Sequence, residues 1–286
     1  MANQSVSFRT VTIDGINIFY RAAGDPNQQA IVFLNGVPNA SAAFQEIIED
    51  LKDNYYLIAP DFPGFGHSGV PDPNDYSYTF DNISKTIEKF IDTIGLKNPS
   101  VYALGYGGPI TFRIATRRPT LFRSYILQNS NVYEEGLGPA MTDAAPYLAN
   151  RNEETTRLVK PLFTIDGIKL FFLHGAKDSS TINPDHYITA LHHLNRPGQE
   201  SIQLDLLYNY ATNIAEYPKW QKWLKDTQPK MLLVWGKNDP FFPLAAAEAI
   251  KKDVPSATLV AYDTSHLALE EHHREIAKDI IAFLSK

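Results

Sequence analysis

The sequence predicts an α/β fold in which a mostly parallel, eight-stranded sheet is flanked by helices. Three observations lead to this prediction: short runs that are apolar throughout, helical patterns that alternate with these runs, and one long stretch in which the alternation stops. A run that is apolar at every position is typical of a strand buried on both faces, as in a parallel sheet. Strands that alternate with helices along a chain indicate a doubly wound sheet.

The first two strands are expected to form a hairpin, because residues 11–13 and 16–20 flank Asp14-Gly15, a favoured two-residue turn. Six apolar runs predict the other strands, at residues 30–34, 55–59, 101–104, 124–127, 231–235 and 258–262. Helical patterns lie at residues 43–51, 80–94, 109–116, 244–252 and 276–284. Asp81 is the expected N-cap of the second of these helices.

Between residues 131 and 220 the chain contains no apolar strand run. Helix-like pieces, prolines and many aromatic residues fill this stretch. We interpret it as a helical cap inserted after the sixth strand, with residues 1–130 and 221–286 forming the α/β core. A length of 286 residues allows either two domains or one large one, and a single core with an insertion explains it.

Composition excludes several classes of protein. The absence of cysteine rules out disulfides, thiolate metal sites and a cysteine nucleophile. A formal net charge of −6 argues against nucleic-acid binding, which favours basic patches. No apolar run approaches the ~18 residues of a membrane helix, and the polar start lacks the apolar core of a signal peptide. We therefore expect a cytoplasmic protein, monomeric or homodimeric, that binds neither nucleic acid nor a membrane.

Five short motifs follow predicted strands, at the sheet edge where open α/β sheets bind their ligands. They are Leu34-Asn35-Gly36-Val37-Pro38, Asp61-Phe62-Pro63-Gly64-Phe65-Gly66-His67-Ser68, Ala103-Leu104-Gly105-Tyr106-Gly107-Gly108-Pro109, Trp235-Gly236-Lys237-Asn238-Asp239-Pro240-Phe241 and Asp263-Thr264-Ser265-His266. In this order the motifs resemble the α/β-hydrolase superfamily over nearly the whole chain. The stretch Asn129-Ser130-Asn131-Val132-Tyr133-Glu134-Glu135-Gly136 adds to the similarity with the branch that holds haloalkane dehalogenases and epoxide hydrolases. The resemblance implies an α/β-hydrolase fold with a helical cap.

In that superfamily the turn after the fifth strand carries the nucleophile. In this sequence Gly105 stands at that position, where the dehalogenase branch has Asp and the esterase branches have Ser. Glycine has no side chain, so no covalent ester intermediate can form there. Either Gly105 replaces a native Asp, or the natural protein has lost its nucleophile and carries out different chemistry.

The resemblance assigns the remaining site residues. Asp239 stands at the position of the catalytic acid and His266 at that of the base. The backbone N–H groups of Val37 and Tyr106 would be the oxyanion donors, and they survive the loss of the nucleophile. Val37 and Tyr106 also replace the two side chains that bind halide in many haloalkane dehalogenases, which argues against dehalogenation. Further candidates for substrate binding are Asn35, Asn129, Tyr133, Tyr147, His174 and Tyr208.

Three functions are compatible with this set of residues. The first is a hydrolase of the dehalogenase, epoxide hydrolase or esterase type whose nucleophile has been removed. The second is a natural nucleophile-free enzyme, such as a lyase, cyclase, dehydratase or cofactor-free oxygenase, with His266 and Asp239 as a general base. The third is a non-catalytic binder of a small molecule. In each case the cap aromatics predict a small hydrophobic or aromatic ligand, and no metal or organic cofactor is implied.

Overall fold

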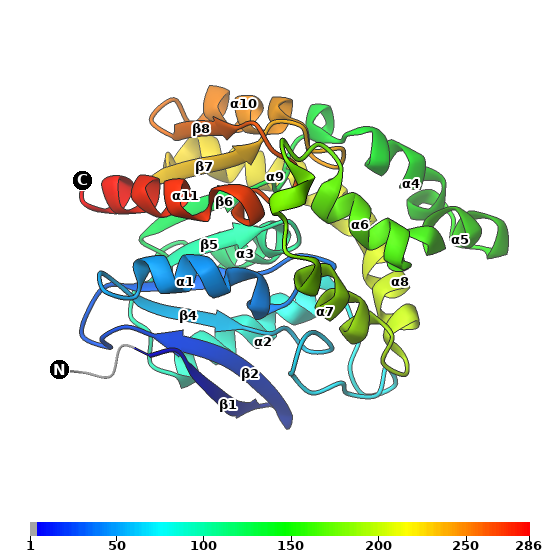
Figure 1. The fold of residues 1–286 in the computed structure, drawn as a ribbon, viewed down its shortest axis with the longest axis horizontal. Coiled ribbons are helices and arrows are strands. Elements are labelled where there is room, and N and C mark those ends of the chain that lie inside the picture. The colour runs from blue at the N-terminus through cyan, green and yellow to red at the C-terminus, as the bar shows by residue number, and fades with distance from the viewer. Residues whose placement is uncertain (1–4) are drawn as a thin grey trace.

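The computed structural model describes residues 5–286, and its centre is one eight-stranded sheet (Figure 1). The strands are β1 (Ser7–Ile13), β2 (Ile16–Ala23), β3 (Ala30–Leu34), β4 (Tyr56–Pro60), β5 (Ser100–Leu104), β6 (Ser124–Gln128), β7 (Met231–Gly236) and β8 (Thr258–Tyr262). Their order across the sheet is β1-β2-β4-β3-β5-β6-β7-β8. The strands from β3 to β8 are parallel, while β2 is antiparallel to both β1 and β4. This arrangement confirms the predicted fold class, including the N-terminal hairpin.

Helices cover both faces of the sheet (Figure 1). On one face a 3-10 turn, η1 (Ser41–Phe44), leads into α1 (Gln45–Leu51), which packs on α11 (Leu269–Leu284). The other face carries α2 (Phe80–Thr93), α3 (Gly107–Arg117), α9 (Ala211–Thr227) and α10 (Leu244–Asp253). α11 begins seven residues before the predicted start at 276. It has a kink at His272, whose backbone is not helical.

A run of helices separates β6 from β7, as the predicted fold requires. It consists of η2 (Glu134–Gly136), α4 (Pro139–Ala149), α5 (Glu153–Val159), η3 (Lys160–Phe163), α6 (Ile165–Leu173), η4 (Ser179–Thr181), α7 (Pro184–Leu194), α8 (Gln199–Asn209) and α9. Figure 1 shows α4 to α8 beyond the carboxyl ends of the parallel strands. The predicted cap boundary at residue 220 falls inside α9, which continues to Thr227.

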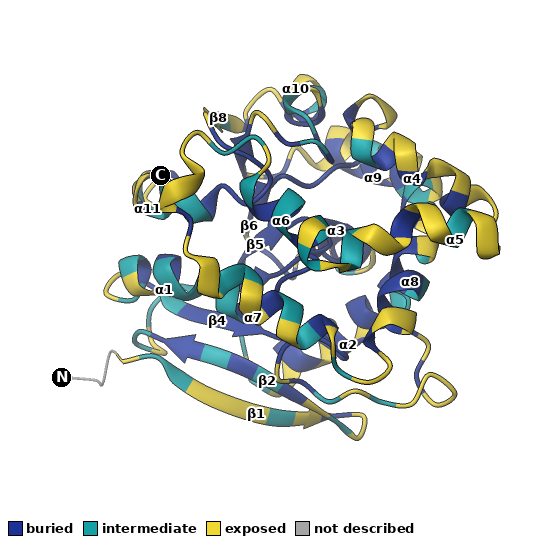
Figure 2. Cartoon of the chain, turned by 45° about the vertical axis from the view of Figure 1, so that its right-hand side comes forward, coloured by how far each residue is buried: buried dark blue, intermediate teal, exposed yellow. Residues whose placement is uncertain are grey.

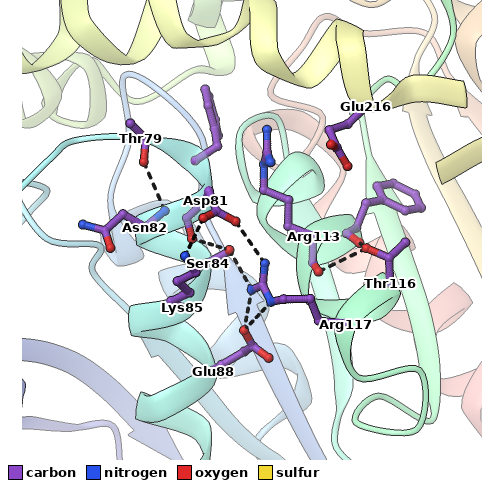
Figure 3. Close-up of polar contacts among 12 residues, drawn as sticks. Thr79, Asp81, Asn82, Ser84, Lys85, Glu88, Arg113, Thr116, Arg117 and Glu216 are labelled. Atoms are coloured by element: carbon purple, nitrogen blue, oxygen red, sulfur yellow. Dashed lines mark hydrogen bonds and ion pairs between the residues drawn. The ribbon is translucent and has the colours of Figure 1, made fainter. Parts of the chain in front are cut away.

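The N-cap of α2 differs from the prediction. The cap is Thr79, whose hydroxyl accepts the N–H of Asn82 at 3.2 Å (Figure 3). Asp81 lies inside the first turn instead, where its carboxylate pairs with Lys85 at 2.7 Å. An acidic side chain in the first turn is still favourable because it faces the positive end of the helix dipole. The sequence therefore placed the helix correctly and its cap two residues too late.

Polar contacts fix α3, the helix that follows Gly105. Arg117 of α3 reaches α2, where it pairs with Glu88 (Figure 3). On its other side, Arg113 donates to Asn213 of α9 at 3.0 Å. α3 is thus held by both of its neighbours.

The core lies in the central strands and in the helix faces turned toward them (Figure 2). β5, β6 and β7 are buried at every residue, which confirms the interpretation of uninterrupted apolar runs as strands covered on both faces. The edge strand β1 is largely exposed and leaves Phe8 61% accessible. Within residues 5–286 no helix combines the length and the apolar character that crossing a membrane requires.

Candidate active site

His266 and Asp239 form a buried pair just beyond the ends of β7 and β8. Nδ1 of His266 lies 2.7 Å from Oδ2 of Asp239, and the two side chains are only 4% and 0% exposed. Because a carboxylate only accepts hydrogen bonds, the neutral imidazole must carry its proton on Nδ1. Nε2 then presents a lone pair, which is the arrangement of a general base oriented by an acid.

Two consecutive amide side chains at the end of β6 hold this pair in place. Asn129 donates from Nδ2 to Oδ2 of Asp239 at 2.8 Å, and Gln128 donates from Nε2 to the carbonyl of His266 at 3.2 Å. The backbone N–H of Phe241 donates to the other oxygen of Asp239 at 2.7 Å. Asn129 has a φ of +44°, in the left-handed region that asparagine tolerates better than most residues. The acid is therefore fixed by side chain and backbone together.

Gly105 occupies the turn between β5 and α3, directly beside the imidazole. Its φ of +52° lies in the left-handed region that favours glycine. A Cβ added to Gly105 would lie 3.3 Å from Nε2 of His266 and 3.5 Å from Cα of Gly36. The carbonyl of Gly105 accepts a hydrogen bond from the hydroxyl of Ser130 at 3.0 Å. A side chain at position 105 would thus point at the base, and it would touch the base closely.

Two backbone N–H groups next to Gly105 have no acceptor within residues 5–286. They belong to Val37, in the loop after β3, and to Tyr106, the N-cap of α3. The two segments approach closely, since a Cβ added to Gly36 would lie 3.0 Å from the nitrogen of Tyr106. The first turn of a helix also carries a partial positive charge. The free N–H groups of Val37 and Tyr106 can therefore stabilise negative charge beside the imidazole.

An apolar cavity opens onto these groups. Its walls come from the sheet edge and from the helices between β6 and β7. Its lining residues are Val37, Gly105, Tyr106, Ala140, Met141, Ala144, Leu162, Phe163, Phe171, Leu207, Tyr210, Phe241, Phe242 and His266. Burial raises the pKa of the Tyr106 and Tyr210 hydroxyls, so both stay neutral.

Three phenylalanines surround the imidazole of His266. The ring centroids of Phe171, Phe241 and Phe242 lie 5.9, 5.4 and 6.0 Å from that of His266. Phe171 and Phe241 stack on each other at 4.2 Å. These rings make the surroundings of the base apolar and favour a ligand with a hydrophobic body in the cavity.

The six residues predicted to bind substrate do not line this cavity. They are Asn35, Asn129, Tyr133, Tyr147, His174 and Tyr208. Tyr133 and Tyr147 donate their hydroxyls within the protein, to Asp253 and to the carbonyl of Leu204. Asn35 donates to the carbonyl of Asn39, and Tyr208 is 39% exposed. His174 lies at the C-cap of α6, and the side chain of Asn129 is committed to Asp239.

Other aromatic residues line the cavity instead, and none of them is among the six predicted residues. Phe241 and Phe242 directly follow the Asn238-Asp239-Pro240 motif, so their place after a strand was a usable signal. Tyr210 stands at the break between α8 and α9. Phe171 lies within a helical pattern that gives no sign of which face meets the base.

A family model described as the alpha/beta hydrolase fold matches residues 29–273. The chain belongs to the α/β-hydrolase family. An uncharacterized hydrolase of Saccharomyces cerevisiae is 33% identical over 291 residues, covering 100% of both proteins. A haloalkane dehalogenase of Bradyrhizobium diazoefficiens is 30% identical over 118 residues, which span 41% of this chain and 37% of that relative.

Solved structures of dehalogenases share the α/β-hydrolase fold of this chain. A mutant of the haloalkane dehalogenase DatA from Agrobacterium tumefaciens C58 superposes with a TM-score of 0.81 at 21% identity, covering 99% of this chain and 98% of that one. The haloalkane dehalogenase DbeA from Bradyrhizobium elkani gives a TM-score of 0.79 at 18% identity, with coverages of 98% and 99%. The family model confirms the predicted α/β-hydrolase superfamily, and the solved dehalogenases share its fold.

Proposed function

We propose that this α/β-hydrolase hydrolyses small, neutral, hydrophobic acyl compounds without a covalent intermediate. In this proposal Gly105 stands at the nucleophile position, and His266 activates a water molecule that attacks the substrate directly. One observation carries the proposal. A Cβ added to Gly105 would lie 3.3 Å from Nε2 of His266, and Nδ1 of the same ring lies 2.7 Å from Oδ2 of Asp239. The base is thus oriented toward a place where the chain supplies no nucleophile of its own.

The reaction follows from the positions of these groups. Nε2 of His266 accepts a proton from water while the water oxygen attacks the carbonyl carbon of the substrate. Asp239 stabilises the imidazolium that forms. The N–H groups of Val37 and Tyr106 stabilise the negative oxygen of the tetrahedral intermediate. The imidazolium then returns the proton to the leaving oxygen, so the acid and the alcohol are released in one sequence.

The lining of the cavity supports a neutral substrate. It contains no lysine, arginine, aspartate or glutamate. A charged group deep in the cavity would lose its hydration without gaining a partner, which costs several kcal/mol or more. The two N–H donors favour an acyl compound over an epoxide. They can stabilise the oxyanion that forms from a carbonyl group, and no nucleophile carboxylate occupies them.

Hydrolysis of neutral p-nitrophenyl esters of increasing acyl length tests this proposal. His266→Gln should lower kcat/KM about 10²- to 10⁴-fold, which is the usual contribution of a general base. His192→Gln is the matched control, because His192 is an exposed histidine of α7. Equal activity of wild type and His266→Gln would refute the role of the base. Solvent deuterium entering a substrate C–H bond without hydrolysis would refute ester hydrolysis in favour of proton abstraction, and ligand binding without any turnover would refute catalysis.

A further inference from the structure

We propose that the position of the missing nucleophile is a binding site for the carboxylate of a hydrophobic monocarboxylic acid, with its alkyl chain in the apolar cavity. This inference rests on the proposed function and deepens it, because it names the acyl part of the substrate and predicts that the free acid binds to the same groups. Three features of the site support it: unused donors, an unpaired buried imidazole nitrogen and the absence of a carboxylate at Gly105.

The donors are the first feature. The N–H groups of Val37 and Tyr106 have no acceptor within the described part of the chain. Tyr106 is the N-cap of α3, a helix of 11 residues, so the N-terminal end of its dipole faces the site. Backbone N–H groups at a helix N-terminus are a common binding site for anions, because donors and dipole both favour negative charge.

The imidazole of His266 is a second, independent observation. His266 is 3% exposed and lines the cavity, and its Nε2 has no hydrogen-bond partner among residues 5–286. The same nitrogen lies 3.3 Å from the point at which a side chain of Gly105 would begin. A carboxylate bound there would accept a hydrogen bond from protonated Nε2 while Asp239 accepts from Nδ1. Binding of the acid should therefore leave a proton on His266.

Gly105 removes the group that would oppose such a ligand. An aspartate at this position, as in the dehalogenase branch that the sequence resembles, would place its own negative charge beside Val37, Tyr106 and His266. Two carboxylates sharing one set of donors repel each other strongly when they are buried. With glycine at position 105, the donors are free for a carboxylate that comes from outside.

The cavity determines the rest of the ligand. Its apolar side chains suit an alkyl chain, and they offer no partner for a second charge. Each further methylene buried in the cavity should lower the dissociation constant about fourfold. We therefore expect affinity to rise from butanoate to hexanoate to octanoate.

Isothermal titration calorimetry with octanoate and its neutral analogue octanol tests the inference. We expect octanoate to bind wild type at least about tenfold more tightly than octanol, because hydrogen bonds to a charged group are the stronger ones. Gly105→Asp should weaken octanoate binding about tenfold or more, whereas Gly105→Asn, which has the same size without the charge, should weaken it less. Octanol binding by both variants shows that the cavity is intact. The imidazole ¹⁵N signals of His266 should move toward the protonated form when octanoate binds.

Equal binding of octanol and octanoate would overturn the inference, and so would equal losses in Gly105→Asp and Gly105→Asn. Unchanged His266 signals on octanoate binding would overturn it as well. The outcome is separable from that of the proposed function. Ester hydrolysis without carboxylate binding refutes the inference alone, while carboxylate binding without ester hydrolysis refutes the proposed function alone.

Discussion

The stability of a Gly105→Ala variant depends directly on the shape of the turn beside the base. A residue with a Cβ pays about 1–2 kcal/mol for a left-handed backbone such as the φ of +52° at Gly105. Alanine also lowers the conformational entropy of the unfolded chain, which offsets about 0.4–1 kcal/mol of this cost. The new methyl group would also lie 3.3 Å from Nε2 of His266, closer than ordinary van der Waals contact. The imidazole cannot retreat freely, because Asp239 holds its other side.

We therefore expect Gly105→Ala to lower the free energy of unfolding by about 0.5–3 kcal/mol, measured by urea denaturation. Gly95→Ala is the matched control, because Gly95 has a φ of +74° and no atom within 4 Å of an added Cβ. The excess loss in Gly105→Ala, about 0.5–1.5 kcal/mol, should equal the cost of turning the imidazole away from its preferred rotamer. This excess should disappear when His266→Ala is the common background.

Two results would refute this reasoning. Gly105→Ala could prove as stable as Gly95→Ala, in which case the Cβ direction of Gly105 does not meet the imidazole. Alternatively, the excess could persist with His266→Ala, in which case another neighbour causes it.

Two further predictions concern groups that hold the site and the helices around it. Asn129→Gly keeps the left-handed backbone accessible but removes the hydrogen bond to Asp239 (2.8 Å). It should lower the free energy of unfolding in urea by about 1–3 kcal/mol and lower the rate of ester hydrolysis roughly tenfold. No effect on either quantity would show that Asn129 does not position the acid. His186→Gln should destabilise the protein near pH 6 and far less near pH 10. Hydrogen bonds to Glu270 and Glu46 raise the pKa of His186 to about 10. The stability that protonated His186 contributes is therefore complete below about pH 6.5 and is lost as the pH rises through 10. Urea unfolding at both pH values checks this with His192→Gln, an exposed neighbour, as control, and a larger effect at high pH would contradict it.

The fold could be predicted from the sequence because strands buried on both faces leave a plain signal. Runs such as 101–104 and 231–235 are short and apolar at every position, and they alternate with helical patterns, as buried parallel strands do. The pairing of Asp239 with His266 was also accessible, since each follows a strand and the carboxyl ends of parallel strands meet at one edge. The strands and the two residues that follow them could therefore be predicted from local sequence patterns, without tertiary contacts.

The walls of the cavity could not be predicted, because they depend on how the helices between β6 and β7 pack. Tyr147 and Phe171 both lie in helical patterns rich in apolar residues, and only the packing turns Phe171 toward His266 and Tyr147 toward Leu204. Asn129 was a predicted substrate-binding residue, but its backbone is left-handed and its amide bonds to Asp239. Similarly, the sequence pattern did not predict the first turn of α11, which is separated from the rest of the helix by the non-helical His272.

The position of Gly105 as a nucleophile site facing His266 is tested most directly by mass spectrometry of the double variant Gly105→Asp/His266→Gln, on the intact protein and then on its proteolytic peptides. The first substitution supplies a carboxylate that can attack, and the second removes the base that would release the resulting ester. After incubation with a panel of neutral aryl epoxides, we predict an adduct with the mass of the epoxide on the peptide that contains position 105, and none on wild type. A folded double variant that forms no adduct, or one that carries it on another peptide, would contradict the assignment of Gly105.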